Sequence, residues 1–111
     1  QKLWLDWGGF ATLDRNDPRF VSRSTGQNPA SYHNGDSWFF LNNIAALAMR
    51  RLAPSRYRRY IVKIRAASRN DILLGQVLGG VSELSSAEKF SPAGSVLQAW
   101  SAASFLKLLN F

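Results

Sequence analysis

The chain contains no cysteine and a single histidine among its 111 residues. With no thiolate and only one imidazole it cannot assemble the ligand sets that zinc sites use, so we expect no metal and no cofactor. The Gly-rich stretch at 75–80 lacks the lysine of a phosphate-binding loop and the spacing of a dinucleotide site. The absence of cysteine fits a reducing, cytoplasmic compartment.

Long hydrophobic runs and an initiator residue are missing as well. No apolar run approaches the roughly 20 residues that cross a bilayer, so we expect no membrane partner. The only methionine is Met49 and the first residue is Gln1, which predicts either a processed chain or a piece of a longer protein. Residues 1–111 leave room for a single domain. The composition, 46% hydrophobic, predicts a folded chain rather than a disordered one.

Acidic residues are scarce, since seven Asp and Glu stand against 14 Lys and Arg, for a net charge of +7. Such a balance suggests nucleic-acid binding as one hypothesis. The basic residues are concentrated between Arg50 and Arg69, however, and Tyr57 and Tyr60 fall on the apolar side of that segment, away from the charges. We interpret the charges as a solvated helix face and expect no nucleic-acid partner. A basic helix for nucleic acid or membrane is the alternative.

Three helices are predicted, over residues 37–53, 56–69 and 96–110, with irregular segments at 1–34 and 75–94. The first and third are apolar on all sides, which is typical of helices inside a larger structure. The second has one apolar face and one basic face, which is typical of a surface helix. The N-cap candidates are Asp36, Ser55 and Ser95. Pro54 is expected to end the first helix, and a short helical restart is expected at Asp71.

The fold class expected from this order is all-α, with an inner, an outer and another inner helix. An (α/α)6 toroid alternates inner and outer helices and carries its active-site loops at one end. Two helices that are apolar all round and one amphipathic helix cannot cover one another. We therefore expect the remainder of a barrel, or self-association, to bury the exposed apolar surface.

Three polar segments adjoin the apolar helices: S-Y-H-N-G-D-S-W at 31–38, V-S-E-L-S-S-A at 81–87 and Q-A-W-S at 98–101. Aromatic faces, hydrogen-bonding groups and one placed carboxylate suit a pocket that cleaves a sugar. In order and spacing the segments resemble the C-terminal part of the amylo-α-1,6-glucosidase domain of glycogen debranching enzymes. The resemblance covers nearly the whole chain. It implies glycogen or a branched maltooligosaccharide as substrate and a six-hairpin glycosidase-like toroid as fold.

Glu83 is the catalytic candidate that the resemblance singles out. In the family a short motif, Glu then Leu then Ser or Thr, holds the general base, and Glu83-Leu84-Ser85 matches it. The alternative is an ordinary loop carboxylate or a cap. The family's acid is an Asp in another context, and we expect it outside this chain because none of the available residues has that context. Those residues are Asp6, Asp14, Asp17, Asp36 and Asp71, and Glu88 is interpreted as a solvated loop residue.

A substrate-binding role is implied for two further groups of residues. The first lies before the first predicted helix, where the family has a similar Tyr-His-x-Gly segment, and comprises Tyr32, His33, Asn34, Asp36 and Trp38. The second, Gln98 and Trp100, resembles the family's Gln-Ala-Trp-Ser. Structural roles are the alternatives: His33 as a hydrogen-bonding residue, Asp36 as a helix cap and Trp100 as core. A stand-alone carbohydrate-binding or assembly module without catalysis is the rival function.

Overall fold

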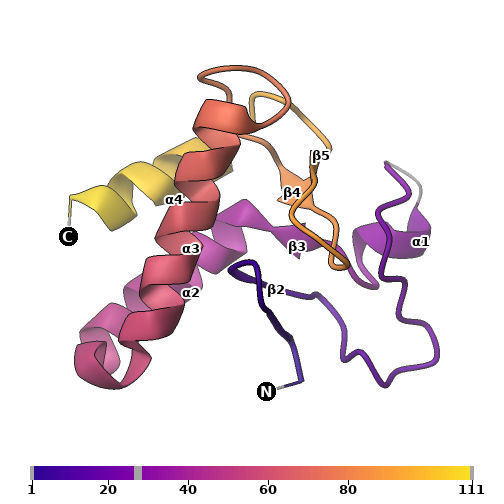
Figure 1. Ribbon diagram of the computed structural model, residues 1–111, viewed down its shortest axis with the longest axis horizontal. Helices are drawn as coiled ribbons and strands as arrows, with labels where there is room; N and C mark the ends of the chain where they lie inside the picture. Colours follow the sequence, from indigo (N-terminus) through magenta and orange to yellow (C-terminus); the bar gives the residue numbers. More distant parts are fainter. Residues whose placement is uncertain (1, 27–28, 111) are drawn as a thin grey trace.

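The computed structural model describes residues 2–26 and 29–110 (Figure 1). Three long helices gather on one side, with loops and short strands on the other. Helix α2 (Phe39–Leu52) packs against both α3 (Pro54–Leu74) and α4 (Ala99–Leu109), while α3 and α4 contact each other less. Helix α2 is therefore the centre of the helical layer.

Short strands and one short helix organise the remaining segments. Strands β1 (Trp4–Leu5) and β2 (Gly9–Phe10) form an antiparallel hairpin near the N-terminus. A second antiparallel sheet has the order β3-β4-β5 and joins segments that are far apart in the chain. Its strands are β3 (Ser37–Trp38), β4 (Leu84–Ser85) and β5 (Pro92–Ala93), and helix α1 (Pro29–Tyr32) precedes them.

The helix-rich prediction is confirmed, but the small sheets were not predicted and several boundaries were wrong. Residues 37–38 are extended because they pair with β4, so α2 begins at Phe39 and its N-cap position is Trp38, with no side-chain cap. Pro54 is the first residue of α3, a position that tolerates proline because its missing N–H would be unsatisfied there anyway. That helix continues without a break through Asp71.

The proposed caps were also wrong. The Asp36 carboxylate accepts hydrogen bonds from the hydroxyls of Ser31 (2.8 Å) and Ser24 (3.2 Å), and not from the first turn of α2. Ser55 lies inside α3, and α4 begins only after Gln98. The backbone amide of Ser95 instead donates to the side chain of Glu83.

The core consists of two apolar clusters. Ala46, Leu47, Ile64 and Leu108 pack between the three long helices, with Trp4 and Phe10 against them. Leu5, Ala11 and Ala87 join the hairpin to the loop after β4. Two asparagines of α2 bind neighbouring elements: the Asn42 side chain accepts the backbone amide of Phe10 in β2 (2.9 Å), and the Asn43 side chain accepts the hydroxyl of Ser68 in α3 (2.9 Å).

Each of the two helices predicted to be apolar all round buries only one face in this chain. Along α2, Leu41 is 47% exposed and Ile44 49%. Along α4, Trp100 is 62% exposed and Leu106 59%. The described helices do not by themselves form a closed toroid, and these faces stay uncovered. The toroid therefore remains a prediction. None of the helices within 2–26 and 29–110 is long and apolar enough to cross a membrane.

Candidate active site

Strand pairing places Glu83 beside the segment that leads into α2. Ser37 faces Ser85 and Trp38 faces Leu84 in the β3-β4 ladder. The next backbone amide, of Phe39, donates to the carbonyl of Glu83 at 3.2 Å. Two of the three polar segments of the sequence therefore lie against each other.

The Glu83 carboxylate is held by donors on both oxygens. The Tyr32 hydroxyl, 51 positions earlier in the chain, donates to Oε1. The backbone amide of Ser95 donates to Oε2 at 3.0 Å, and the amide of Glu83 donates in return to the Ser95 carbonyl at 2.9 Å. The side chain of Glu83 is buried, since the residue is only 8% exposed. Its orientation is therefore fixed by three contacts from two separate segments.

Gly94 makes room for this carboxylate. Its φ is +74°, a conformation that side chains other than that of glycine rarely adopt. A Cβ at this position would also collide with Oε2 and Cβ of Glu83. The loop after β5 can therefore close over Glu83 only with glycine at position 94.

Tyr32 remains a hydrogen-bond donor over the whole physiological pH range. Its hydrogen bond to Glu83, with a smaller contribution from burial, raises the pKa of the Tyr32 phenol to about 12. A deprotonated phenol would bring a second negative charge against the carboxylate. The pair therefore consists of a protonated phenol and an acceptor carboxylate.

Aromatic side chains surround this pair. Trp38 lies edge-on to Tyr32 with ring centroids 4.6 Å apart, and its indole N–H donates to the Tyr32 carbonyl at 3.0 Å. His33, which is exposed, is stacked on Trp38 with centroids 5.8 Å apart and planes 4° from parallel. The stack offers flat apolar faces and an imidazole next to a fixed carboxylate, which suits a sugar ring better than an ion.

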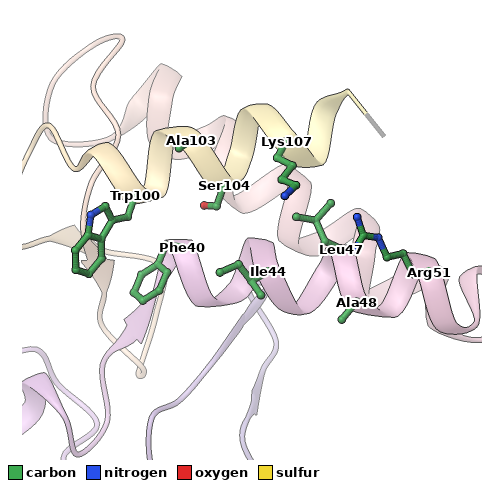
Figure 2. Close-up of a pocket in the computed structure, with 9 residues that line it drawn as sticks. All are labelled: Phe40, Ile44, Leu47, Ala48, Arg51, Trp100, Ala103, Ser104 and Lys107. Atoms are coloured by element: carbon green, nitrogen blue, oxygen red, sulfur yellow. The ribbon is translucent and has the colours of Figure 1, made fainter.

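The aromatic chain continues into a groove between α2 and α4 (Figure 2). Phe40 contacts Trp38 at 6.1 Å and Trp100 at 5.5 Å between centroids. The groove has a volume of about 580 Å³, with Phe40 and Trp100 at one end and Arg51 and Lys107 towards the other. Glu83 is not among its lining residues, so the groove does not contain the carboxylate and is linked to it through Phe40, Trp38 and Tyr32.

Three of the predicted binding residues make contacts that support the fold. Asp36 is fully buried against its serines, and burial raises the pKa of this carboxyl. The Asn34 side-chain amide donates to the Ala30 carbonyl at 3.2 Å. Gln98 donates its backbone amide to the Val81 carbonyl at 2.8 Å, which ties the third polar segment to the start of the Glu83 loop. Both serine bonds are on Oδ2, and Oδ1 is buried without a partner in the described part of the chain, so direct sugar contact would require the loop over Asp36 to open.

Asp71 is a supporting residue that the sequence analysis did not assign. It is 1% exposed at the end of α3, and one carboxylate oxygen accepts the backbone amide of Ser82 at 2.7 Å. The other oxygen is buried without a partner in the described part of the chain, and burial raises the pKa of the group. Asp71 thus fixes the residue directly before Glu83. Its position as the one acid on a basic helix was the available signal.

Glu88, the next carboxylate along the chain, has different surroundings from Glu83. Glu88, five positions later, is on the surface with Arg23 at 3.6 Å. No hydrogen bond joins Glu83 to a second carboxylate among the residues that the structure describes. Across 2–26 and 29–110 no group of three His, Asp or Glu side chains could hold a metal ion.

A family model described as amylo-alpha-1,6-glucosidase matches residues 2–107 of the chain. The match spans the three polar segments and all the helices except the last residues of α4. The resemblance to the glucosidase domain of debranching enzymes is thereby confirmed. Comparison with curated proteins and with solved structures found no match.

Proposed function

The chain belongs to the amylo-alpha-1,6-glucosidase family, and on that premise we propose that it supplies the general base and part of the sugar pocket of a glycogen debranching enzyme. The substrate is branch-point glucose joined by an α-1,6 bond. The other parts of the pocket, including the acid, come from the remainder of an (α/α)6 toroid. The isolated chain is inactive because it lacks that acid.

The single observation that carries the proposal is the contact between Tyr32 and Glu83 across 51 positions. It joins the predicted binding segment to the predicted catalytic residue. Ordinary loop carboxylates face solvent, whereas this one is buried and receives hydrogen bonds on both oxygens. Such support is expected where a carboxylate must keep one orientation during a reaction.

In the proposed mechanism Glu83 takes a proton from a water molecule. The water oxygen forms a bond to the anomeric carbon on the face opposite the leaving group, while the bond from that carbon to the branch oxygen breaks. The acid from the rest of the enzyme protonates the departing oxygen. In inverting enzymes the two carboxyl groups lie about 6.5–9.5 Å apart, which leaves room for the water. The product is β-glucose.

The aromatic groups hold the sugar in this scheme. Trp38 and Trp100 offer ring faces to the C–H faces of glucose, with His33, Asn34 and Gln98 near them for hydroxyl groups. Tyr32 serves mainly the carboxylate, because its hydroxyl is already donated to Glu83. Asp36 supports the loop through Ser24 and Ser31.

The test is Glu83→Gln in the complete enzyme, assayed on a branched glucan. The amide keeps the shape and removes the basicity, so we expect kcat to fall by about 10²–10⁴-fold with little change in KM. Glu88→Gln is the matched control, since Glu88 is a surface carboxylate paired with Arg23, and it should retain full activity. Near-wild-type turnover by Glu83→Gln, or a larger loss in Glu88→Gln, would refute the assignment.

A further inference from the structure

The basic face of α3 divides into two sets of residues with different surroundings. Three of the basic side chains have partners within the chain. Arg56 and Arg59 lie over the rings of Tyr57 and Tyr60 at 5.6 and 4.6 Å. Lys63 donates to the Asp6 carbonyl at 2.7 Å. These three contacts belong to the fold and explain part of the charge.

The second set is a stripe of Arg58, Arg65 and Arg69, which we call the arginine stripe. With Val62 these residues follow the i, i+4, i+7, i+11 pattern, so they lie on one side of α3 over about 16 Å. All three arginines are exposed. The ion pairs of the described chain are Lys2–Asp14, Arg19–Asp17 and Arg23–Glu88, and none involves the stripe. The one acid of α3, Asp71, is buried.

Two adjoining hollows flank the arginine stripe. One has a volume of about 320 Å³ and includes Arg58, Val62 and Arg65. The other, about 340 Å³, shares Val62 and Arg65 and adds Arg69 with Phe105 and Leu109 of α4. Neither has an acidic residue in its lining among the described residues. Val62 is 57% exposed and Leu109 45%, so apolar surface lies between the charges.

We propose that this groove binds an acidic amphipathic segment of another protein. Arginine is favoured at interfaces because its planar fork binds carboxylates through two hydrogen bonds and its stem packs on apolar surface. Carboxylates spaced along one side of a helix would meet the three arginines, and an apolar side chain between them would pack on Val62 and Leu109. This partner lies on a different surface from the glucosidase pocket, so the inference is independent of the proposed activity.

The composition of the groove favours an acidic protein segment over nucleic acid, a lipid bilayer or a second copy of the chain. Phe105, the one aromatic residue among the described residues that line the groove, is 5% exposed, so it offers no ring face to stack on nucleic-acid bases. A second copy of the chain that docked at this groove through the same face would oppose two arginine stripes, and like charges repel. Two exposed aliphatic side chains, Val62 and Leu109, among three arginines are also too little apolar surface to enter a lipid bilayer.

The experiment uses the full chain and a fluorescent synthetic peptide of about five helical turns, with Glu and Leu at helical spacing. We expect binding that weakens as salt rises, because exposed charges are screened beyond about 10 Å at 0.1 M ionic strength. The variant Arg58→Gln, Arg65→Gln, Arg69→Gln should bind at least about tenfold more weakly. The matched variant Arg56→Gln, Arg59→Gln, Lys63→Gln removes the same charge and should bind within about twofold of wild type. Val62→Ser, which changes no charge, should also weaken binding.

Three results would overturn the proposal. They are no binding at low salt, equal losses of affinity in the two triple variants, and equal binding of a scrambled peptide of the same composition. Tighter binding of oligouridine RNA or of phosphatidylserine vesicles through the arginine stripe would assign the groove to that ligand instead. A dimer that disappears in the stripe variant would assign it to a second copy.

Discussion

At the scale of single residues, neighbouring groups fix the position and orientation of the Glu83 carboxylate. The Tyr32 hydroxyl and the Ser95 amide occupy its two oxygens, Gly94 gives it room, and Asp71 fixes the residue before it. A carboxylate restrained in this way keeps its orientation without help from substrate. That preorganisation is what a water-activating base needs.

The titration of Tyr32 tests the hydrogen bond directly. In the wild-type chain the bond to Glu83 raises the pKa of this phenol to about 12, from an ordinary value of 10.0. Glu83→Gln removes the negative charge, so Tyr32 should then ionise at lower pH, closer to 10.0. Tyrosinate absorbance across alkaline pH measures this, with Glu88→Gln as the control. Identical alkaline titrations of wild type and Glu83→Gln would show that Tyr32 does not bind Glu83.

The identity of the site residues was open to prediction, but their contacts were not. Residue types and spacing pointed to Glu83 and Tyr32 through the family resemblance. The contact of Ser95 with Glu83 was not predicted, because it is made by the Ser95 backbone amide, and every residue type except proline has such a donor. Asp71 was taken only as a possible helix restart, since its burial depends on the loop that folds back over it.

At the scale of elements, the β3-β4 pair replaces the expected first turn of α2. Ser37 and Trp38 carry no signal that separates a helix start from an extended pair. Their conformation is decided by Leu84 and Ser85, far along the chain. The interiors of the helices were predictable from periodicity, and the ends were not, because long-range hydrogen bonds determine them.

The end of α3 makes stability depend on pH. Burial raises the pKa of Asp71 above its ordinary 3.8, so between 3.8 and the raised value the folded chain binds more protons than the unfolded one. Stability from this group therefore falls as pH rises through that window. In Asp71→Asn the amide oxygen still accepts the Ser82 amide, but no charge is buried. The free energy of unfolding of Asp71→Asn minus that of wild type should be larger at neutral pH than near pH 4.

Urea unfolding of both proteins across this range measures that difference. Ser68→Ala serves as the control, because it removes a buried hydroxyl of α3 that does not titrate here. If the free energies of unfolding of wild type and Asp71→Asn change with pH in parallel, then folding does not bury the charged form of Asp71.

At the scale of the whole molecule, α2 and α4 carry exposed apolar faces that we expect a partner or a second copy to cover. Leu41 and Ile44 on one helix, and Trp100 and Leu106 on the other, are each close to half exposed or more. A soluble monomer rarely leaves so many large apolar side chains in neighbouring positions. The rest of the proposed toroid would bury them in the complete enzyme.

We therefore expect the isolated chain to self-associate at micromolar concentration through these faces. Replacing Ile44 and Leu106 together with serine should weaken association at least about tenfold, since burying each large apolar side chain contributes roughly 1.5–3 kcal/mol. Sedimentation equilibrium gives the comparison. Val77→Ser, an exposed apolar change on the loop after α3, is the control. A well-folded monomer at all concentrations would argue against a missing remainder.

The most direct test of the central claim, that Glu83 activates the attacking water, is chemical rescue of Glu83→Ala in the complete enzyme. Removing the side chain opens space beside the anomeric carbon, where azide can attack without needing a base. We expect azide to restore turnover of branch-point glucose, with β-glucosyl azide as the product, formed as the α-1,6 bond breaks. Glu88→Ala should give no such product. Turnover of Glu83→Ala at the wild-type rate without azide, or an azide product of α configuration, would show that Glu83 is not the general base.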